Sequence, residues 1–282
     1  MALTRPVDSD ALRRAGEWVR PVTLAGEQLL AVTAPLAPLF PEGGLRRGST
    51  VTVEGGPGAT SLALALGAAA STGGSWVAGV NLPSLGLLAA AELGVSLERV
   101  VMVGGVDPGT WPAVVAALLD AVDVVWAGLP RRVSPGDARR LAARARERGS
   151  VLVPVLAWSA APDGGTPPRA GDWPVAADVR LRPVPSSGWV GPGAGGAGHL
   201  AARRVEVVAG GRGAAAQERR VNLWLPAPDG GVAPADAGLT LPSPDRDLSP
   251  LRSLSPFEPL GSEKRQRTGR GSGGTGKRGA EM

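Results

Sequence analysis

Along residues 49–157, segments in which hydrophobic residues have the spacing of a strand alternate with segments in which they have the spacing of a helix. Short apolar runs bounded by turn residues predict strands, and the stretches between them have the spacing of helices. Strands that alternate with helices indicate a parallel sheet covered on both faces, so we expect an α/β fold. The expected strands are residues 50–54, 75–80, 99–103, 122–127 and 151–157, and the expected helices are residues 60–71, 84–93, 110–120 and 135–148.

The pattern changes after residue 158. Residues 177–184, 203–210 and 219–226 alternate charged with apolar side chains, which is typical of antiparallel or edge strands with one wet face. Beyond residue 227 apolar content falls and Gly, Pro, Ser and charged residues dominate, so we expect disorder there. Three regions follow: an N-terminal helix and lead-in over 1–48, a mostly parallel α/β domain with a C-terminal antiparallel extension over 49–227, and a disordered basic tail over 228–282.

Composition excludes several kinds of chemistry. The 282 residues include no cysteine, no tyrosine and one histidine, His199, which lies in a glycine-rich stretch. Disulfides, cysteine-based zinc sites and cysteine nucleophiles are therefore excluded, and a catalytic triad is not expected. The two lysines, Lys264 and Lys277, both lie in the tail, so no lysine of the expected domain can hold a phosphate. We expect neither a metal nor an organic cofactor.

The net charge of +5 belongs mainly to the tail, because residues 248–282 hold seven basic and three acidic side chains. A glycine-spaced cationic segment can bind an acidic surface or nucleic acid without fixed geometry, so weak DNA binding is expected here. Apolar residues at near three-residue intervals precede it and predict a protein contact, with a simple linker as the alternative. The apolar residues are Leu251, Leu254, Phe257 and Leu260, and the cations are Lys264, Arg265, Arg267, Arg270, Lys277 and Arg278.

The best-marked helix runs from a Ser134 cap to Gly149. Arg140, Arg144 and Arg148 follow each other at four-residue spacing on its polar face. They form either a contact surface for phosphates or an acidic partner, or an ordinary solvated helix face. Trp126 and Trp224 lie in apolar runs and are expected in the core.

Residues 49–71 run from a strand through a glycine-rich turn into an Ala/Leu helix, which is the layout of a phosphate-binding loop. The loop keeps a hydroxyl at Thr60, but Ala59 stands where the lysine belongs and the glycine spacing is two residues short. A helix N-terminus retains some affinity for anions, so weak phosphate binding remains open. The relic loop consists of Gly55, Gly56, Gly58, Thr60 and Ser61.

Three segments resemble the core of RecA-type recombinases: "GGLRRGSTVTVEGGPGATSLALALGAA", "ELGVSLERVVMV" and "LLDAVDVVWAGLP". The whole layout is similar to the actinobacterial ImuA-prime proteins, RecA-like accessory factors of the damage-induced mutasome. The segments "DVRLRP", "LAARRVEVV" and "RRVNLWLP" resemble their closing strands. The resemblance covers roughly residues 25–227 and implies a RecA-like core.

Carried over residue by residue, the resemblance implies that phosphoryl-transfer chemistry is lost. Gly128 or its neighbour replaces the magnesium-binding aspartate, and residues 80–84 contain no carboxylate to activate water. With Ala59 in place of the lysine, three charged groups are absent together, so we expect a pseudo-ATPase. Asp123 starts its strand and is expected to be a surface charge.

The resemblance also implies partners: a Y-family-like polymerase subunit of the mutasome and, through it, an error-prone C-family polymerase and the sliding clamp. Two alternatives stay open, a SulA-like inhibitor of cell division and an unorthodox DNA-dependent ATPase completed by a neighbouring subunit's arginine. Self-association and a DNA contact through residues 159–172, where Arg169 is the sole cation, are further expectations. No apolar run approaches the ~18 residues of a membrane helix, so we expect a cytoplasmic protein, nucleoid-associated after damage.

Overall fold

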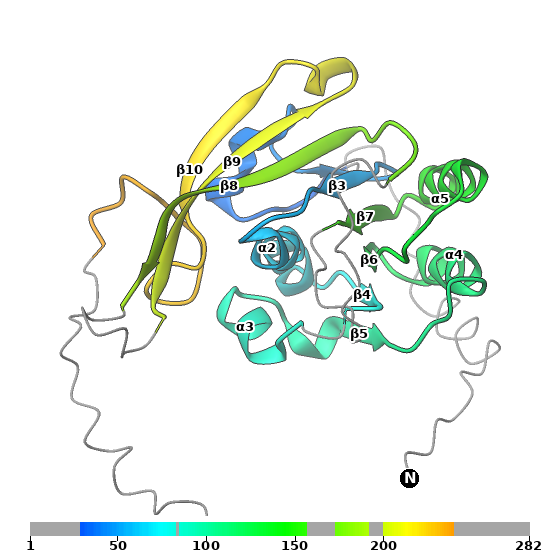
Figure 1. Cartoon of the computed structure of the whole chain (residues 1–282), viewed down its shortest axis with the longest axis horizontal. Helices are drawn as coiled ribbons and strands as arrows, with labels where there is room; N and C mark the ends of the chain where they lie inside the picture. Colours follow the sequence, from blue (N-terminus) through cyan, green and yellow to red (C-terminus); the bar gives the residue numbers. More distant parts are fainter. Residues whose placement is uncertain (1–28, 83–84, 157–172, 192–199, 240–282) are drawn as a thin grey trace, which may run out of the picture. The chain divides into compact units, whose positions relative to one another are not determined.

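A nine-stranded mixed sheet organises the computed structural model (Figure 1), which describes residues 29–82, 85–156, 173–191 and 200–239. The order of the strands is β11-β10-β9-β8-β3-β7-β6-β4-β5. The strands are β3 (Val51–Val53), β4 (Val77–Val80), β5 (Val100–Val103), β6 (Val124–Gly128), β7 (Val151–Val155), β8 (Val179–Val190), β9 (Ala202–Gly211), β10 (Arg219–Trp224) and β11 (Ala233–Pro234).

The two halves of the sheet pair differently. Strands β5, β4, β6, β7, β3 and β8 are parallel to their neighbours, whereas β8, β9, β10 and β11 pair antiparallel. A helix follows each of β3, β4, β5 and β6 and returns the chain to the end where the next parallel strand begins. The closing strands follow the period-two pattern of their sequence. The expected α/β fold with a mostly parallel sheet and a C-terminal antiparallel extension is confirmed.

Helices cover both faces of the parallel strands (Figure 1). On one face, α2 (Ala59–Thr72) and α3 (Leu87–Glu92) pack with the 3-10 helix η1 (Ala34–Leu39) over an apolar core. On the other face, α4 (Trp111–Ala121) and α5 (Pro135–Arg148) cover a second core. The remaining short elements are β1 (Leu29–Leu30), β2 (Leu45–Arg46), η2 (Leu97–Arg99) and η3 (Gly213–Ala215).

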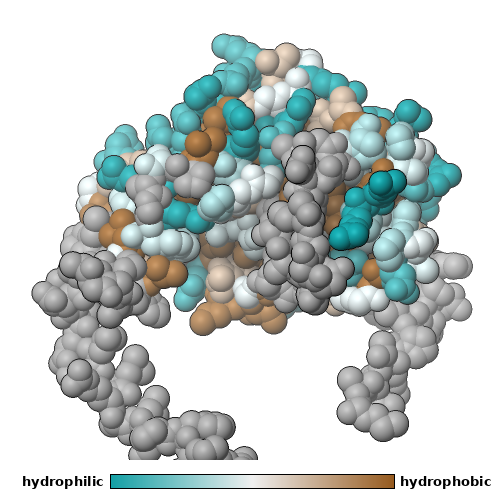
Figure 2. All heavy atoms as spheres, in the orientation of Figure 1, coloured by the Kyte–Doolittle hydropathy of each residue, from teal (hydrophilic) through white to brown (hydrophobic). Residues whose placement is uncertain are grey.

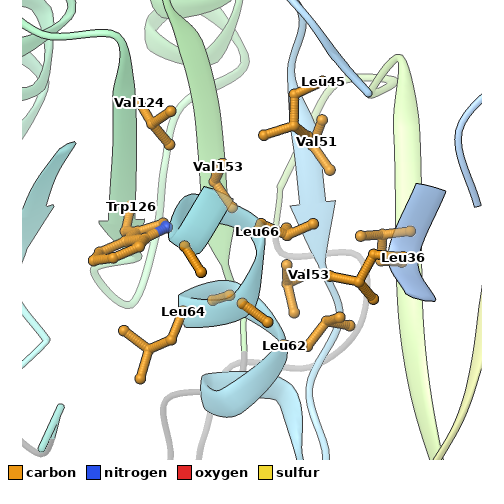
Figure 3. Packing of buried hydrophobic residues seen from close by; sticks show 14 of the residues in the cluster. Leu36, Leu45, Val51, Val53, Leu62, Leu64, Leu66, Val124, Trp126 and Val153 are labelled. Atoms are coloured by element: carbon orange, nitrogen blue, oxygen red, sulfur yellow. The ribbon is translucent and has the colours of Figure 1, made fainter. Parts of the chain in front are cut away.

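Helix α2 is buried along most of its length because its residues are apolar and small. Leu62 and Leu66 pack against Val51 and Val53 of the central strand (Figure 3). Trp126 lies in the same core with its side chain fully buried, and Trp224 is 3% exposed, so both tryptophans are core residues as expected.

The ordered domain is longer at both ends than the sequence indicated. Leu36 and Leu39 of η1 are fully buried in the core of α2, so residues 29–48 belong to the domain and are not a separate lead-in. At the other end, Ala233 of β11 pairs with Trp224, so the sheet continues beyond residue 227. The expected boundaries at 48 and 227 are therefore corrected to include residues 29–48 and 228–239.

Asp123 connects three segments at the amino end of β6. Its carboxylate accepts a hydrogen bond from Arg47 Nη1 at 2.7 Å and another from the Trp76 amide at 3.0 Å. The carboxylate is thus part of the folded framework, and the expectation of a simple surface charge is corrected.

Within the described ranges, no helix has both the length and the apolar character required to cross a bilayer.

Candidate functional site

The carboxyl ends of β3, β4 and β6 lie at one edge of the sheet, which is where open α/β sheets bind ligands. After β3 the chain turns through Gly56 and Gly58 into α2. Gly58, the residue preceding the helix, has φ of +101°, and Gly56 has φ of +138°. Both angles favour glycine, so the backbone keeps the strand, loop and helix that the sequence predicted.

The first turn of α2 offers hydrogen-bond donors. The Ala59 amide donates to Gly56 O at 3.1 Å, but within the described residues the amides of Thr60 and Ser61 have no acceptor. Neither does any side chain cap this helix end. Free amides together with the helix dipole make this end of α2 attractive to an anion.

The backbone leaves no room for a side chain at Gly128, where the resemblance to recombinases expects a magnesium-binding aspartate. A Cβ atom on Gly128, at the end of β6, would lie 2.3 Å from the carbonyl oxygen of Asn81 and 2.9 Å from that of Val80. The Gly128 carbonyl oxygen accepts a hydrogen bond from Trp111 Nε1 at 2.9 Å. No side chain fits at residue 128 without moving the end of β4, so the carboxylate is sterically excluded as well as absent.

The end of β4 also has a structural role, which the residue that follows it, Asn81, provides. Asn81 follows β4 with φ of +49°, a conformation that asparagine tolerates better than most residues. Its side-chain amide donates to Val106 O at 2.8 Å and its side-chain oxygen accepts from Val106 N at 3.0 Å. This residue therefore ties the loop after β5 to the end of β4, where recombinases would carry a catalytic carboxylate.

Arg203 of β9 reaches the relic loop, and the sequence prediction did not identify it. Its Nη2 atom lies 2.9 Å from the position that a Cβ on Gly58 would occupy. The residue is only 7% exposed, and its guanidinium stacks on Trp189 with Cζ 4.7 Å from the ring centre. The sequence did contain a sign of its burial, because the period-two pattern of β9 places Arg203 on the same face as the core residues Val205 and Val207.

The charge of Arg203 is not balanced within the described part of the chain. Its buried Nε atom has no hydrogen-bond partner there. Glu54, which precedes the loop, instead has its Oε1 atom 3.8 Å from Arg180 Nε. Burial lowers the pKa of Arg203, because the charged guanidinium loses part of its hydration.

The arginines of α5 already have acidic partners within the chain. Arg144 Nε and Nη2 each donate to a carboxylate oxygen of Asp120 at 2.6 Å, and Arg148 Nε lies 3.0 Å from Asp120 as well. Arg140 pairs with Asp137. The hydrogen bonds that Arg144 donates to the Asp120 carboxylate stabilise the charged guanidinium and raise the pKa of Arg144. All three arginines are therefore paired with acidic side chains on the polar face of the helix, and the predicted Ser134 cap is confirmed.

An apolar surface patch lies over α3 and the edge strand β5. Leu88 is 73% exposed, and Leu87, Leu97 and Met102 are also exposed. Apolar atoms gather over α3 at the lower edge of Figure 2. Exposed apolar residues that gather on one part of a surface mark contact surfaces more often than sites of chemistry.

Several predicted site residues lie outside the described residues. These are His199, Arg169 with its loop, and every tail residue from Leu251 to Arg278.

Parts of the chain match known sequences. A family model described as the MT3502 N-terminal domain matches residues 38–160. Rv3395c, an uncharacterized protein of Mycobacterium tuberculosis (strain ATCC 25618 / H37Rv), is 45% identical over 98 residues, which are 34% of this chain and 47% of that protein. The chain thus matches about half the length of this curated relative.

Among solved structures, the RadB recombinase superimposes with a TM-score of 0.51 and 15% sequence identity, over 73% of this chain and 98% of that one. Identity this low shows the fold alone. It confirms the expected RecA-like α/β core.

Proposed function

We propose that this chain is a non-catalytic, RecA-like accessory protein of damage-induced translesion synthesis, of the ImuA-prime kind. One observation carries the proposal: a side chain at Gly128 would overlap the Asn81 carbonyl, which supports the loss of a magnesium-binding carboxylate at the position where the resemblance expects one. Ala59 in place of the lysine and Asn81 bound to Val106 support the same conclusion. Three separate contributions to phosphoryl transfer are missing together.

A protein with this core and no catalytic groups can act by presenting surfaces. The apolar patch of Leu87, Leu88, Leu97 and Met102 is suited to a protein partner or to a second copy of the chain. We assign the Y-family-like polymerase subunit as the direct partner, with the error-prone C-family polymerase and the sliding clamp reached through it. The mycobacterial relative supports the actinobacterial resemblance and is itself uncharacterized.

Purified protein is expected to show no ATP hydrolysis above background and at most about millimolar nucleotide affinity, because the loop lacks a lysine and the end of β6 lacks a carboxylate for magnesium. Steady-state phosphate release with magnesium, with and without single-stranded DNA, measures this. Magnesium-dependent turnover that disappears in Thr60→Ala would contradict the proposal and favour the unorthodox ATPase.

Partner capture tests the function itself. Full-length chain is expected to retain the polymerase subunit from damage-treated cells, whereas a chain ending at residue 239 is expected to retain less of it at unchanged thermal stability. The reason is that the basic tail adds electrostatic attraction and its apolar segment adds a directional contact.

Two matched variants divide the tail's contribution. Phe257→Ala is expected to weaken protein capture alone, and neutralising the six tail cations is expected mainly to reduce salt-sensitive DNA binding. A SulA-like inhibitor of cell division is expected to bind a tubulin-like division protein, so capture of that protein in place of the polymerase subunit would refute the proposal in favour of this alternative. Equal capture by both chain lengths would move the contact to the folded domain.

A further inference from the structure

We propose that the relic loop and Arg203 together form a binding site for a single carboxylate of an acidic segment in a partner protein. The site comprises the amides of Thr60 and Ser61 at the start of α2 and the guanidinium of Arg203 beside Gly58. This inference builds on the proposed scaffold function and assigns it a specific contact.

The geometry brings two positive groups together, and no counter-ion lies beside them among the residues that the structure describes. The N-terminus of α2, a helix of 14 residues, carries roughly half a positive charge. Arg203 adds a full positive charge and is only 7% exposed. Among the described residues, it has no carboxylate partner. Burying an unpaired charge costs free energy, and a bound anion would offset that cost.

Glycine at position 58 is what allows this approach. With φ of +101° and no side chain, Gly58 leaves room for Arg203 Nη2 at the start of α2. The guanidinium therefore reaches, from a different strand, the loop in which Ala59 replaces the lysine.

The charge and shape of the site favour a carboxylate over a nucleotide. One guanidinium and one helix end balance a single negative charge, and a guanidinium pairs with a carboxylate through two parallel hydrogen bonds. A triphosphate carries several charges and needs a full-length loop, a lysine and magnesium, but this loop is two residues short and Gly128 is closed.

The surroundings also fit a protein contact. Trp189, on which Arg203 stacks, is 39% exposed. Tryptophan and arginine are enriched at the energetic centres of protein interfaces, where a charged group is desolvated beside an aromatic ring. An acidic side chain could bind Arg203 while its own backbone contacts Trp189.

Titration with a blocked Ala-Glu-Ala peptide and its Ala-Gln-Ala twin tests the site directly. The glutamate peptide is expected to shift, saturably, the NMR signals of the Thr60 and Ser61 amides and of the Arg203 Nε–H group. Arg203→Gln is expected to weaken this binding at least about tenfold, because it removes a charge-assisted pair.

Arg204→Gln is the matched control. Arg204 is the next residue on β9, points to the opposite face, and stacks on Trp224 at the same 4.7 Å from Cζ to the ring centre. Its replacement removes the same charge and a similar stacking contact, so affinity is expected to change by less than about twofold. Arg203→Lys, which keeps the charge but not the paired donors, is expected to lie between the two and serves if Arg203→Gln does not fold.

Thermal unfolding gives a second readout. Without peptide, Arg203→Gln is expected to have a higher melting temperature than the wild type, because an unpaired buried charge is gone. Peptide should raise the melting temperature of the wild type and leave that of the variant unchanged.

Equal shifts from both peptides, or equal losses in Arg203→Gln and Arg204→Gln, would overturn the site. Inorganic phosphate or magnesium ATP binding more tightly than the glutamate peptide would overturn the carboxylate assignment in favour of a phosphate ligand. Because these titrations contain no polymerase subunit, their failure leaves the scaffold proposal standing, and failure of partner capture leaves the titrations interpretable.

Discussion

Gly128→Asp is expected to lower the free energy of unfolding by about 4 kcal/mol or more, and not to restore magnesium binding. The new Cβ would lie 2.3 Å from the Asn81 carbonyl oxygen, an atom of the backbone that cannot rotate away. The carboxylate would also be placed against two carbonyl oxygens, which repel it. Urea unfolding followed by circular dichroism measures the loss.

Gly104→Asp provides the matched control. This glycine follows strand β5 at the same sheet edge, and a Cβ there meets no atom within 4 Å. Its replacement introduces the same charge at an exposed position, so the change in unfolding free energy is expected to stay within about 0.5 kcal/mol. A stable Gly128→Asp protein that binds magnesium would show that the position is merely vacant and would weaken the scaffold proposal.

Trp126→Ala is expected to cost about 3–5 kcal/mol of unfolding free energy, because it empties a fully buried volume beneath α2. The indole also explains the glycine above it: a Cβ on Gly67 would lie 2.5 Å from Trp126 Cζ2. Gly67→Ala alone is therefore expected to cost about 1–3 kcal/mol through overpacking.

The double variant decides whether these two residues are coupled. With Trp126 already replaced by alanine, Gly67→Ala should change from destabilising to stabilising by up to about 1 kcal/mol, because alanine is the better helix former and the space is now open. Chemical unfolding of the four proteins measures the cycle. Additive effects would mean that the helix shifts away from Trp126 and that the close contact does not set the packing.

Sequence periodicity alone located the main strands and helices and indicated a mostly parallel sheet with antiparallel closing strands. Apolar runs with turn residues between them located the parallel strands, and the period-two pattern of residues 203–210 identified an antiparallel strand. The glycines located the loop before α2, and the composition showed that the domain contains no lysine. Such features are local, because they depend on which residues follow one another within a strand, turn or helix.

Only the tertiary structure decided what the site contains. Arg203 and Gly58 are 145 positions apart, so their contact depends on how β9 lies beside the sheet. Asp120 forms ion pairs with both Arg144 and Arg148 from a different helix, which helical spacing cannot reveal. The same holds for Gly128. The sequence shows only that this residue has no side chain, whereas the structure shows that the Asn81 carbonyl leaves no room for one. Burial, charge pairing and steric exclusion arise between segments distant in sequence, and the local pattern of residues carries no record of them.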